Sequence, residues 1–276
     1  MTKAARECLI IFTRYPEPGK TKTRLIPLLG AEGAARLQRQ MTEQTLAQVK
    51  ELKAFRPLSV EVHFAGGNQQ LMQNWLGSNT TRDTSPPTPL LQGEGSITPP
   101  FPTREGGGMG SPLGRDGVPS GDEGMGGMGG LGLSYPSSIG LGSDIIYRQQ
   151  SEGDLGRRMA LAFKESFSAG MTGVVIIGTD CPDLKVQLMV KAFHALEQND
   201  LVLGPALDGG YYLIGLRRLI PELFTGISWS TAEVLEQTIS IAQRLDLAIA
   251  FLPLLNDIDR PEDLIGQTVD GYQVEG

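Results

Sequence analysis

Short runs of consecutive apolar residues alternate along the chain with stretches in which apolar residues recur every three or four positions. The clearest run, 174–177, holds four β-branched residues in a row, which is typical of a strand buried on both faces of a parallel sheet. Between residues 31 and 54 the apolar side chains follow a helical spacing instead. This alternation of strand and helix predicts an α/β fold with a mostly parallel sheet flanked by helices.

The other expected elements continue the alternation. Residues 58–65 alternate between apolar and polar, which indicates an edge or half-exposed strand. Asp154 precedes a helical pattern and is expected to cap that helix. Ser230 and Glu233 have the spacing of a capping box, which would open a helix ending near residue 244. Further strands are expected at 8–13, 144–150, 200–205, 211–216 and 248–255, and further helices at 69–76, at 186–198 and from Pro261 onward.

Residues 84–142 break this pattern, because they hold 17 of the 36 glycines and 9 of the 18 prolines. Such a segment buries too little apolar surface to offset the entropy lost on ordering, so we expect a disordered insertion. Its glycines do not lie between a strand and a helix, which disfavours a glycine-rich phosphate cradle. The remaining residues suffice for one core, and residues 1–276 are therefore expected to form a single domain that contains this insertion.

Composition and charge narrow the classes of function. The formal net charge of -7 over 276 residues argues against a nucleic-acid-binding surface. Two cysteines and two histidines argue against a disulfide scaffold, a cysteine-rich zinc site and a histidine-built metal centre. The apolar run 9–12 is too short for a signal peptide or a membrane span. We expect a cytoplasmic protein with no membrane span.

A basic stretch follows the first predicted strand. Arg14, Lys20, Lys22 and Arg24 lie within eleven residues, next to backbone donors and a following helix, which suits the binding of a diphosphate. Residues 19–21 mimic the end of a P-loop, but an arginine replaces the first glycine of that motif, and two prolines remove amide donors. A solvated surface loop is the alternative interpretation.

Two carboxylates, Asp180 and Asp183, follow the central strand. In open α/β sheets, ligands bind outside the carboxyl ends of the strands. A divalent cation that carries phosphates needs carboxylate oxygens at such an edge. Both residues are therefore candidate metal ligands. Alternatively, Asp180 is a turn residue and Asp183 caps the next helix.

The triplet Asp208, Gly209 and Gly210 lies between two further strands. The glycines would let backbone amides approach a bound sugar or phosphate closely, and Asp208 is a candidate proton acceptor. The same triplet is a strong signal for a tight hairpin turn. The two interpretations are compatible.

A last acidic pair, Asp257 and Asp259, flanks Ile258. A period of two places both carboxylates on one face of the strand end, while Ile258 points into the core. Asp259 is better placed to cap the helix at Pro261, which leaves Asp257 as the candidate metal ligand.

Together these stretches resemble the rSAM/selenodomain-associated transferase 1 family, also described as arsenosugar-biosynthesis-type glycosyltransferase-like proteins. The resemblance implies the nucleotide-diphospho-sugar transferase fold, called GT-A, which molybdenum-cofactor and 2-phospholactate nucleotidyltransferases share. Those nucleotidyltransferases open with a glycine-rich loop that ends in Arg and Lys, whereas the loop in this chain is interrupted by prolines. The resemblance covers nearly all of the chain outside 84–142 and is carried by residues 12–24, 153–156, 178–182, 208–212 and 257–259.

The residues and the resemblance lead to one hypothesis with two alternatives. The hypothesis is a metal-dependent glycosyltransferase-like enzyme that moves a sugar from a nucleotide-diphosphate donor to a small acceptor. Asp180 and Asp257 would hold Mg²⁺ or Mn²⁺, the basic stretch would neutralise the leaving group, and Asp208 would act as base on the acceptor hydroxyl. The alternatives are a nucleotidyltransferase that condenses a nucleoside triphosphate with a phosphorylated or acidic acceptor, and an inactive sugar-nucleotide-binding module.

Overall fold

The computed structural model describes residues 6–77, 145–265, 268–269 and 272–273. These residues fall within one compact unit, which comprises residues 1–80 and 136–276. The predicted insertion, 84–142, lies outside the described residues. None of the helices in the described part of the chain is both long and apolar enough to cross a membrane.

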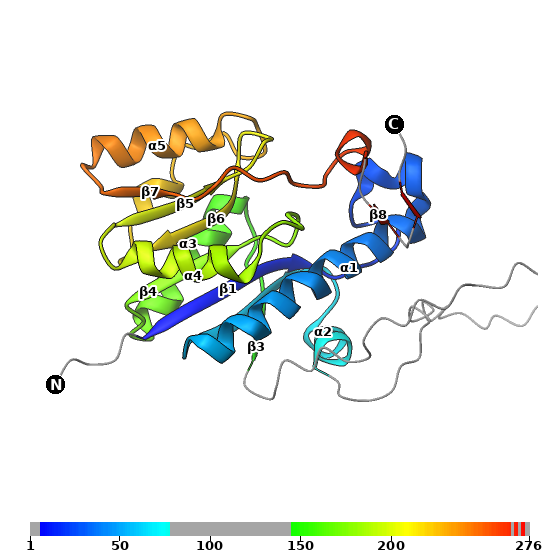
Figure 1. Cartoon of the computed structure of the whole chain (residues 1–276), viewed down its shortest axis with the longest axis horizontal. Coiled ribbons are helices and arrows are strands. Elements are labelled where there is room, and N and C mark those ends of the chain that lie inside the picture. The colour runs from blue at the N-terminus through cyan, green and yellow to red at the C-terminus, as the bar shows by residue number, and fades with distance from the viewer. Residues whose placement is uncertain (1–5, 78–144, 266–267, 270–271, 274–276) are drawn as a thin grey trace, which may run out of the picture. The chain divides into compact units, whose positions relative to one another are not determined.

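A seven-stranded sheet runs through this unit in the order β3-β2-β1-β4-β6-β5-β7 (Figure 1). Within this sheet β6 is antiparallel to its neighbours β4 and β5, and the other neighbouring strands are parallel. The predicted α/β fold with a mostly parallel sheet is confirmed. Its strands are β1 (Glu7–Arg14), β2 (Ser59–Ala65), β3 (Ile146–Gln149), β4 (Gly173–Ile177), β5 (Leu201–Pro205), β6 (Tyr211–Leu216) and β7 (Ile249–Phe251), and a separate antiparallel pair follows at β8 (Thr268–Val269) and β9 (Tyr272–Gln273).

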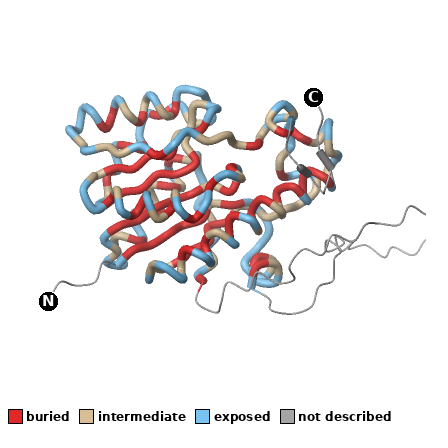
Figure 2. Tube along the Cα trace, viewed as in Figure 1, coloured by how far each residue is buried: buried red, intermediate tan, exposed pale blue. Residues whose placement is uncertain are grey.

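Helices cover both faces of the sheet, so that its central strands are buried (Figure 2). Side chains alternate along β1, so Leu9 and Ile11 pack on one face while Cys8 and Ile10 pack on the other. The first face is covered by α1 (Ile26–Phe55), α2 (Gln69–Leu76) and α4 (Val186–Leu196), and the second by α3 (Leu155–Ser168) and α5 (Val234–Arg244). The described residues also form three short 3₁₀ helices, η1 (Thr23–Leu25), η2 (Pro221–Phe224) and η3 (Pro261–Leu264).

The predicted central strand is confirmed as β4. All five of its residues are buried, because Val174 and Ile176 contribute to the core on one face and Val175 and Ile177 to the core on the other. A strand that packs on both faces has no position for a polar side chain, which explains the unbroken apolar run. It also fixes rigidly the point at which the chain leaves the sheet.

The helical spacing predicted for residues 31–54 is also confirmed. Leu37, Met41 and Val49 are buried along one face of α1. The helix is broken near its start at Gly30, whose backbone has φ 70° and ψ 169°. Glycine adopts this left-handed region without the penalty that a side chain would bring.

The predicted edge position of the second strand is wrong. β2 lies between β1 and β3 and pairs with both of them. Its alternating polar residues, Glu61 and His63, are buried, because Glu61 Oε2 accepts hydrogen bonds from His63 Nε2 and from Arg148 Nε, each at 2.9 Å. Polar alternation here reflects a buried, hydrogen-bonded pair of Glu61 and His63, which Arg148 joins from the surface, and not exposure of β2 to solvent.

Two predicted element ends are also corrected. Ser230 does not cap α5, since its φ is 67° and the helix begins at Val234 after an N-cap at Glu233 without a side-chain bond. β7 ends at Phe251, two residues before Pro253, which has no amide donor for a ladder. The segment still follows β5, because the Leu255 amide donates to the Pro205 carbonyl at 3.1 Å.

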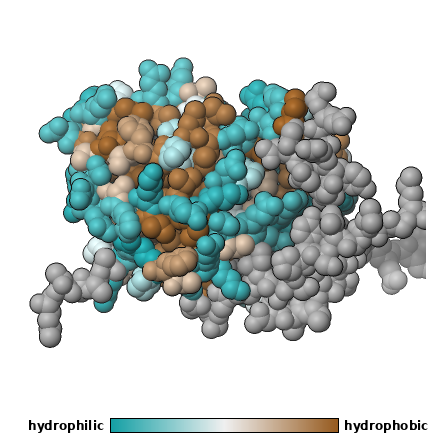
Figure 3. All heavy atoms as spheres, in the orientation of Figure 1, coloured by the Kyte–Doolittle hydropathy of each residue, from teal (hydrophilic) through white to brown (hydrophobic). Residues whose placement is uncertain are grey.

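The surface of this unit leaves several large apolar side chains exposed. Leu207 is 61% exposed, and Phe251 and Leu254 on the β7 side are more than half exposed. In the space-filling view, hydrophobic residues (brown) are visible between hydrophilic ones (teal) (Figure 3).

Candidate functional site

Two adjoining cavities lie at the carboxyl ends of the central strands. The larger has a volume of about 680 Å³ and is lined by residues at the ends of β1, β4 and β5, including Asp180 and Asp208. The smaller, of about 350 Å³, is lined mainly by the basic stretch after β1 and is called the basic pocket below. Arg24, Asp180 and Asp259 line both cavities. This is the edge at which open α/β sheets bind their ligands.

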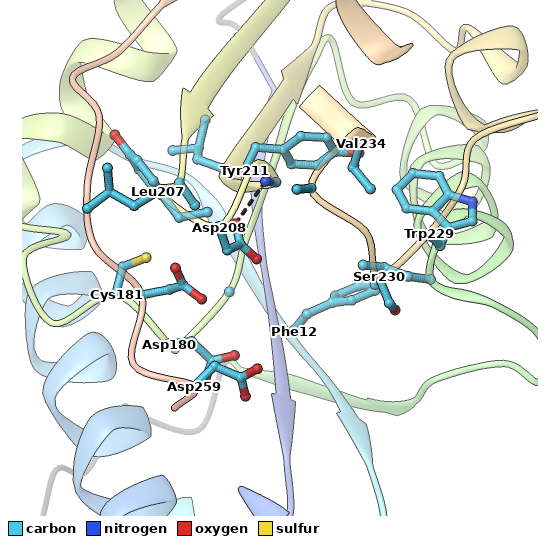
Figure 4. A pocket seen from close by; sticks show the side chains of 18 of the residues that line it. Phe12, Asp180, Cys181, Leu207, Asp208, Tyr211, Trp229, Ser230, Val234 and Asp259 are labelled. Carbon is cyan, nitrogen blue, oxygen red and sulfur yellow. Dashed lines mark hydrogen bonds between the residues drawn. The ribbon is translucent and has the colours of Figure 1, made fainter. Parts of the chain in front are cut away.

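One end of the large cavity is strongly acidic, and its five lining carboxylates form what we call the carboxylate mouth (Figure 4). Burial raises the pKa of Asp257 to about 6, and repulsion from the Asp208 carboxylate and then from Asp263 and Asp180 adds to this increase. Ionising all of these groups together is unfavourable, and a bound cation would relieve the repulsion. The mouth consists of Asp180, Asp208, Asp257, Asp259 and Asp263.

Asp180 is fixed to the basic stretch by a buried lysine. The Lys22 ammonium lies 2.7 Å from Asp180 Oδ1, and the Lys22 side chain is only 4% exposed. The same ammonium donates to the Ile258 carbonyl, while the Ile258 amide donates to the Asp180 carbonyl at 2.9 Å. Ile258 itself is buried, as predicted. Three segments that are far apart in the sequence are thereby held together around Asp180.

The other cations of the stretch line the basic pocket. Arg24 pairs with Asp259, and Lys20 lies 2.7 Å from Glu17 Oε1. Within the described residues the Arg14 side chain makes no hydrogen bond or ion pair, and it is exposed. A cluster of cations with an unpaired, planar guanidinium suits phosphate oxygens.

Beneath the basic stretch lies a buried polar network that the sequence did not reveal. Gln38 Nε2 donates to Thr42 Oγ1 at 3.2 Å and to Thr179 Oγ1 at 3.3 Å, while Thr13 and Thr42 share a bond of 2.9 Å. Thr21 Oγ1 donates to the side-chain oxygen Oε1 of Gln38 at 3.4 Å. Because these groups are buried and paired, they hold the ends of β1 and β4 and the basic stretch in one arrangement.

The Asp-Gly-Gly triplet is a hairpin turn, and it also positions Asp208 in the cavity. The Gly210 amide donates to Asp208 Oδ1 at 2.8 Å (Figure 4), and the Gly209 amide donates to the Ala206 carbonyl at 3.1 Å. Both amides are thus used within the turn. Gly209 has φ 87°, and a Cβ atom there would lie 2.2 Å from the Ala232 carbonyl oxygen. Only glycine fits this close approach of two backbones.

Neither helix cap suggested for this region forms, whether the alternative interpretation of Asp183 or the expected cap at Asp259. Asp183 does not cap α4, because the N-cap is Lys185 and the Val186 amide donates to Gln48 Oε1 at 3.0 Å. Asp183 is exposed and lines neither of the two cavities described above. The structure therefore does not bring it together with the other candidate metal ligands.

Asp259 does not cap the final helix either. Asp263 Oδ2 accepts from the amides of Asp259 and Arg260, at 3.0 and 2.7 Å, so Asp263 satisfies the start of this 3₁₀ helix. The Asp259 carboxylate is left to pair with Arg24. The prediction failed because two acidic residues compete for the same donors, and the helix is too short for its start to be read from spacing.

The donor set fits a divalent ion that arrives with its own phosphates. Among the described residues, no three acidic, histidine or cysteine side chains gather closely enough to hold an ion on their own. Mg²⁺ often keeps several waters and is bound by one or two carboxylates together with substrate phosphates. Asp180 and Asp257, beside the basic pocket, match that mode of binding.

A thiol in the same place is not a nucleophile. Burial, followed by the charges of Asp257 and Asp180, raises the pKa of the Cys181 thiol far above its usual range. The thiolate is the reactive form of cysteine, and it is not populated here near neutral pH.

The other end of the large cavity is apolar and was not predicted. We call it the apolar lobe and define it by five lining residues from β1, α3, α5 and the loop before α5 (Figure 4). A Cβ atom at Gly156 would lie 2.4 Å from the indole of Trp229, so this glycine allows the tryptophan to pack on α3. In the sequence, the signal for this contact is the stretch 153–156, which includes Gly156 and carries part of the family resemblance. The lobe consists of Phe12, Leu155, Met159, Trp229 and Val234.

Comparisons with known proteins agree with this fold. The DUF2064 family model, described as an uncharacterized protein conserved in bacteria, matches residues 133–231. A crystal structure from Desulfovibrio desulfuricans G20, described as a candidate nucleotide-diphospho-sugar transferase, aligns with a TM-score of 0.64 and 27% identity over 93% of this chain and 83% of that one. The fold is therefore GT-A-like. No curated protein matches the chain.

Two enzymes align over similar lengths but more loosely. 4-Diphosphocytidyl-2C-methyl-D-erythritol synthase from Anaerococcus prevotii DSM 20548 has a TM-score of 0.49 and 10% identity, over 94% of this chain and 92% of that one. The inositol-1-phosphate CTP transferase from T. maritima has a TM-score of 0.45 and 11% identity, over 98% and 96%.

Proposed function

We propose that this chain is a metal-dependent glycosyltransferase-like enzyme that transfers a sugar from a nucleotide-diphosphate donor to a small acceptor. The observation that carries the proposal is the contact between the basic pocket and the large cavity at its carboxylate mouth, since the two cavities share Arg24, Asp180 and Asp259. Cations for phosphate oxygens thus lie beside carboxylates for a divalent ion. The likeness to the Desulfovibrio desulfuricans protein and the resemblance to the rSAM/selenodomain-associated transferase 1 family support it.

In this proposal the donor diphosphate lies along the basic pocket. Arg14, Lys20 and Arg24 bind its oxygens, and Lys22 holds Asp180 in place from below. Asp180, with Asp257, holds Mg²⁺ or Mn²⁺. When bound, the ion neutralises negative charge that develops on the leaving nucleoside diphosphate.

Asp208 is proposed as the base that accepts the proton of the acceptor hydroxyl. The turn holds its Oδ1 through the Gly210 amide, which leaves Oδ2 for the acceptor. Gly209 and Gly210 act by shaping the turn, which keeps this carboxylate at the cavity. The reaction then transfers the sugar from the diphosphate oxygen to the acceptor oxygen, and the proton goes to Asp208.

Two measurements test the proposal. First, melting is followed with UDP, GDP, CDP or ADP, each with and without Mn²⁺, because a ligand at a hundred times its Kd adds about 2.7 kcal/mol to the free energy of unfolding. Second, the released product is identified with the nucleotide that binds. A nucleoside diphosphate supports glycosyl transfer, pyrophosphate from a triphosphate indicates nucleotidyl transfer, and binding without turnover indicates an inactive binding module.

The matched variants are Asp180→Asn and Asp183→Asn, which remove one charge each from neighbouring positions. We expect Asp180→Asn to lose about 1.5–3 kcal/mol of Mn²⁺-nucleotide binding, because an amide of the same shape lacks the charge. Asp183→Asn, outside both cavities, should bind as the parent does. A thermal melt of each variant checks that the fold is intact, because Asp180→Asn deprives the buried Lys22 of its ion-pair partner. Unchanged affinity in a folded Asp180→Asn protein would contradict the proposal.

A further inference from the structure

The apolar lobe leaves large hydrophobic surface facing a cavity. Met159 and Val234 are buried, at 3% and 6% exposure. Phe12, Leu155 and Trp229 all pack against the core on the α3 and α5 face, yet each remains only partly buried and lines the cavity. Apolar surface left open in an otherwise packed site is a feature of ligand pockets.

The lobe is also held in a fixed shape. Trp229 packs directly against Gly156, and its neighbour Ser228 is held by two hydrogen bonds. Gln237 Oε1 accepts from the Ser228 amide at 2.7 Å, and Thr231 Oγ1 donates to the Ser228 carbonyl at 2.7 Å. Ser230, beside Trp229, is held at φ 67°, which is unfavourable for a residue with a side chain. Such strain persists where surrounding contacts impose it, and it is concentrated at functional sites.

The position of Asp208 decides which substrate the lobe takes. Figure 4 shows the Asp208 carboxylate between Asp180 and Asp259 on one side and Trp229 and Val234 on the other. In a sugar-nucleotide the nucleoside and the sugar extend from opposite ends of the diphosphate. If the diphosphate binds in the basic pocket and Asp208 is the base, as proposed above, the sugar must lie at Asp208, and the acceptor hydroxyl must reach Asp208 from the side away from that pocket. The space beyond it is the lobe.

The charges around the cavity argue against a phosphorylated acceptor in the lobe. The cations that line the large cavity are Arg24 and Arg260, within the described residues. Arg24 pairs with Asp259 in the carboxylate mouth, and Arg260 lies 3.9 Å from Glu262. The five lobe residues offer no cation to an anionic group, and an unpaired anion there would lose its hydration.

We propose that the acceptor is an uncharged alcohol that carries a flat apolar ring, with the ring in the apolar lobe against Trp229 and the hydroxyl at Asp208. This inference rests on the proposed glycosyl transfer and names its acceptor class. Aromatic side chains that offer a face and an edge favour a planar ring over a flexible polar chain. The same preference disfavours the phosphorylated acceptor of a nucleotidyltransferase.

The test uses Trp229 as its own reporter. The chain has two tryptophans, and Trp75→Phe leaves Trp229 as the single one. Phenyl β-D-glucoside and methyl β-D-glucoside differ only in carrying a phenyl ring or a methyl group on the anomeric oxygen. Each is titrated while the emission of Trp229 is followed. We expect the phenyl compound to change the emission and to bind at least 10-fold more tightly than the methyl compound. Equal binding of the two, or no response to either, would overturn the inference.

A pair of leucine variants in the same background locates the binding. Leu155→Gln places a polar group in the lobe and should weaken phenyl glucoside binding about 10-fold. Leu245→Gln, at the exposed end of α5, should have no effect. Equal effects of the two would overturn the inference, and the glucoside comparison without either substitution remains decisive if Leu155→Gln does not fold.

UDP with Mn²⁺ is titrated into the same proteins, and its affinity should not change with Leu155→Gln. Nucleotide binding without any ring preference would overturn the inference and leave the proposed function standing. A ring preference with no binding of any nucleotide would leave the lobe as a ring site, but the proposed transferase would fail, and the acceptor inference that rests on it would be overturned as well.

Discussion

The two ends of the large cavity differ in how their side chains are held. At the carboxylate mouth, residues on loops are fixed to each other by charge, as in the Lys22–Asp180 and Arg24–Asp259 pairs. In the apolar lobe, residues on β1, α3 and α5 are fixed because they extend the core. The first end should therefore respond to salt, pH and single charge changes, whereas the second should respond to changes in shape.

The turn at Asp208 joins these two ends, because it contacts both. The Gly209 carbonyl accepts from the Leu235 amide at 2.9 Å, in the first turn of the helix that supplies Val234 to the lobe. Asp208 itself belongs to the carboxylate mouth. A change in this turn should thus disturb both ends, whereas changes elsewhere should disturb one.

The largest effect is expected for Gly209→Ala. The new Cβ would lie 2.2 Å from the Ala232 carbonyl oxygen at a backbone φ of 87°, so the turn and the loop before α5 must separate. We expect a loss of about 3 kcal/mol in the free energy of unfolding, from steric clash and backbone strain together, and loss of turnover. Urea unfolding of the variant measures the loss in the free energy of unfolding.

The control for this variant is Gly226→Ala. Gly226 also has a positive φ, of 74°, but a Cβ there meets nothing within 4 Å. The cost should be about 1 kcal/mol, from backbone strain alone. If the two alanine variants lose equal stability, the contact between Gly209 and Ala232 does not hold the ends together.

The contrast between the ends also explains what the sequence could reveal. The charged end was predicted because Asp180, Asp208 and Asp257 are polar residues at the tips of apolar strands, where a core offers no reason for them. The lobe was missed because Met159 and Val234 follow the same helical period as residues that face the core. Periodicity identifies the inward face of a helix, but whether that face meets a strand or a cavity depends on the assembled structure.

Partners in other elements account for several of the other failures. β3 pairs with the outer side of β2 but follows it in the chain only after residue 145. The sequence around β2 therefore suggested an edge strand. Asp183 had the spacing of a helix cap, but Gln48 from α1 satisfies that helix end instead. Gln38 is buried among threonines, although the apolar spacing of its helix gives no sign of a buried polar residue. In each case a residue more than a hundred positions away, or in another element, decides the role.

A second prediction separates the two ends by charge. Arg14→Ala should weaken Mn²⁺-nucleotide binding by about 1.5–3 kcal/mol, because a phosphate loses a charged donor, and the parent's affinity should also fall as salt is added. Phenyl glucoside binding should stay the same, since Arg14 lies at the basic pocket. Calorimetry with each ligand measures both affinities.

Lys164→Ala is the matched control, because this exposed cation lies on α3 and lines neither cavity. It should leave both affinities unchanged, and neither variant should melt differently from the parent, since exposed cations contribute little to stability. Equal nucleotide affinity for Arg14→Ala and Lys164→Ala would mean that the basic stretch is an ordinary surface loop.

The smallest effect concerns pH and Asp257. Burial and the neighbouring Asp208 raise the pKa of Asp257 to about 6, so this carboxyl is protonated below that pH and cannot hold a cation. Mn²⁺-nucleotide affinity should therefore fall as the pH drops from 7 to 5. Phenyl glucoside binding, which involves no titrating group of the lobe, should stay constant over the same range. A parallel fall in both affinities would show that the two ends are not independent.

The same pKa makes a prediction for stability, measured without metal. Because the pKa of Asp257 is higher in the folded protein than in the unfolded chain, the folded state binds this proton more tightly, and ionisation above pH 6 opposes folding. Asp257→Asn removes that cost, so the variant should be more stable than the parent at pH 8, by about 1 kcal/mol once screening by solvent at this half-buried site is considered. The difference should shrink as the pH falls through 6 toward 4, where the parent's carboxyl is neutral as well. Met159→Leu, a change in the lobe, should give a stability difference that does not vary with pH. If Asp257→Asn instead destabilises the protein at pH 8, Asp257 is held by favourable contacts and not by the repulsion that a bound cation would relieve.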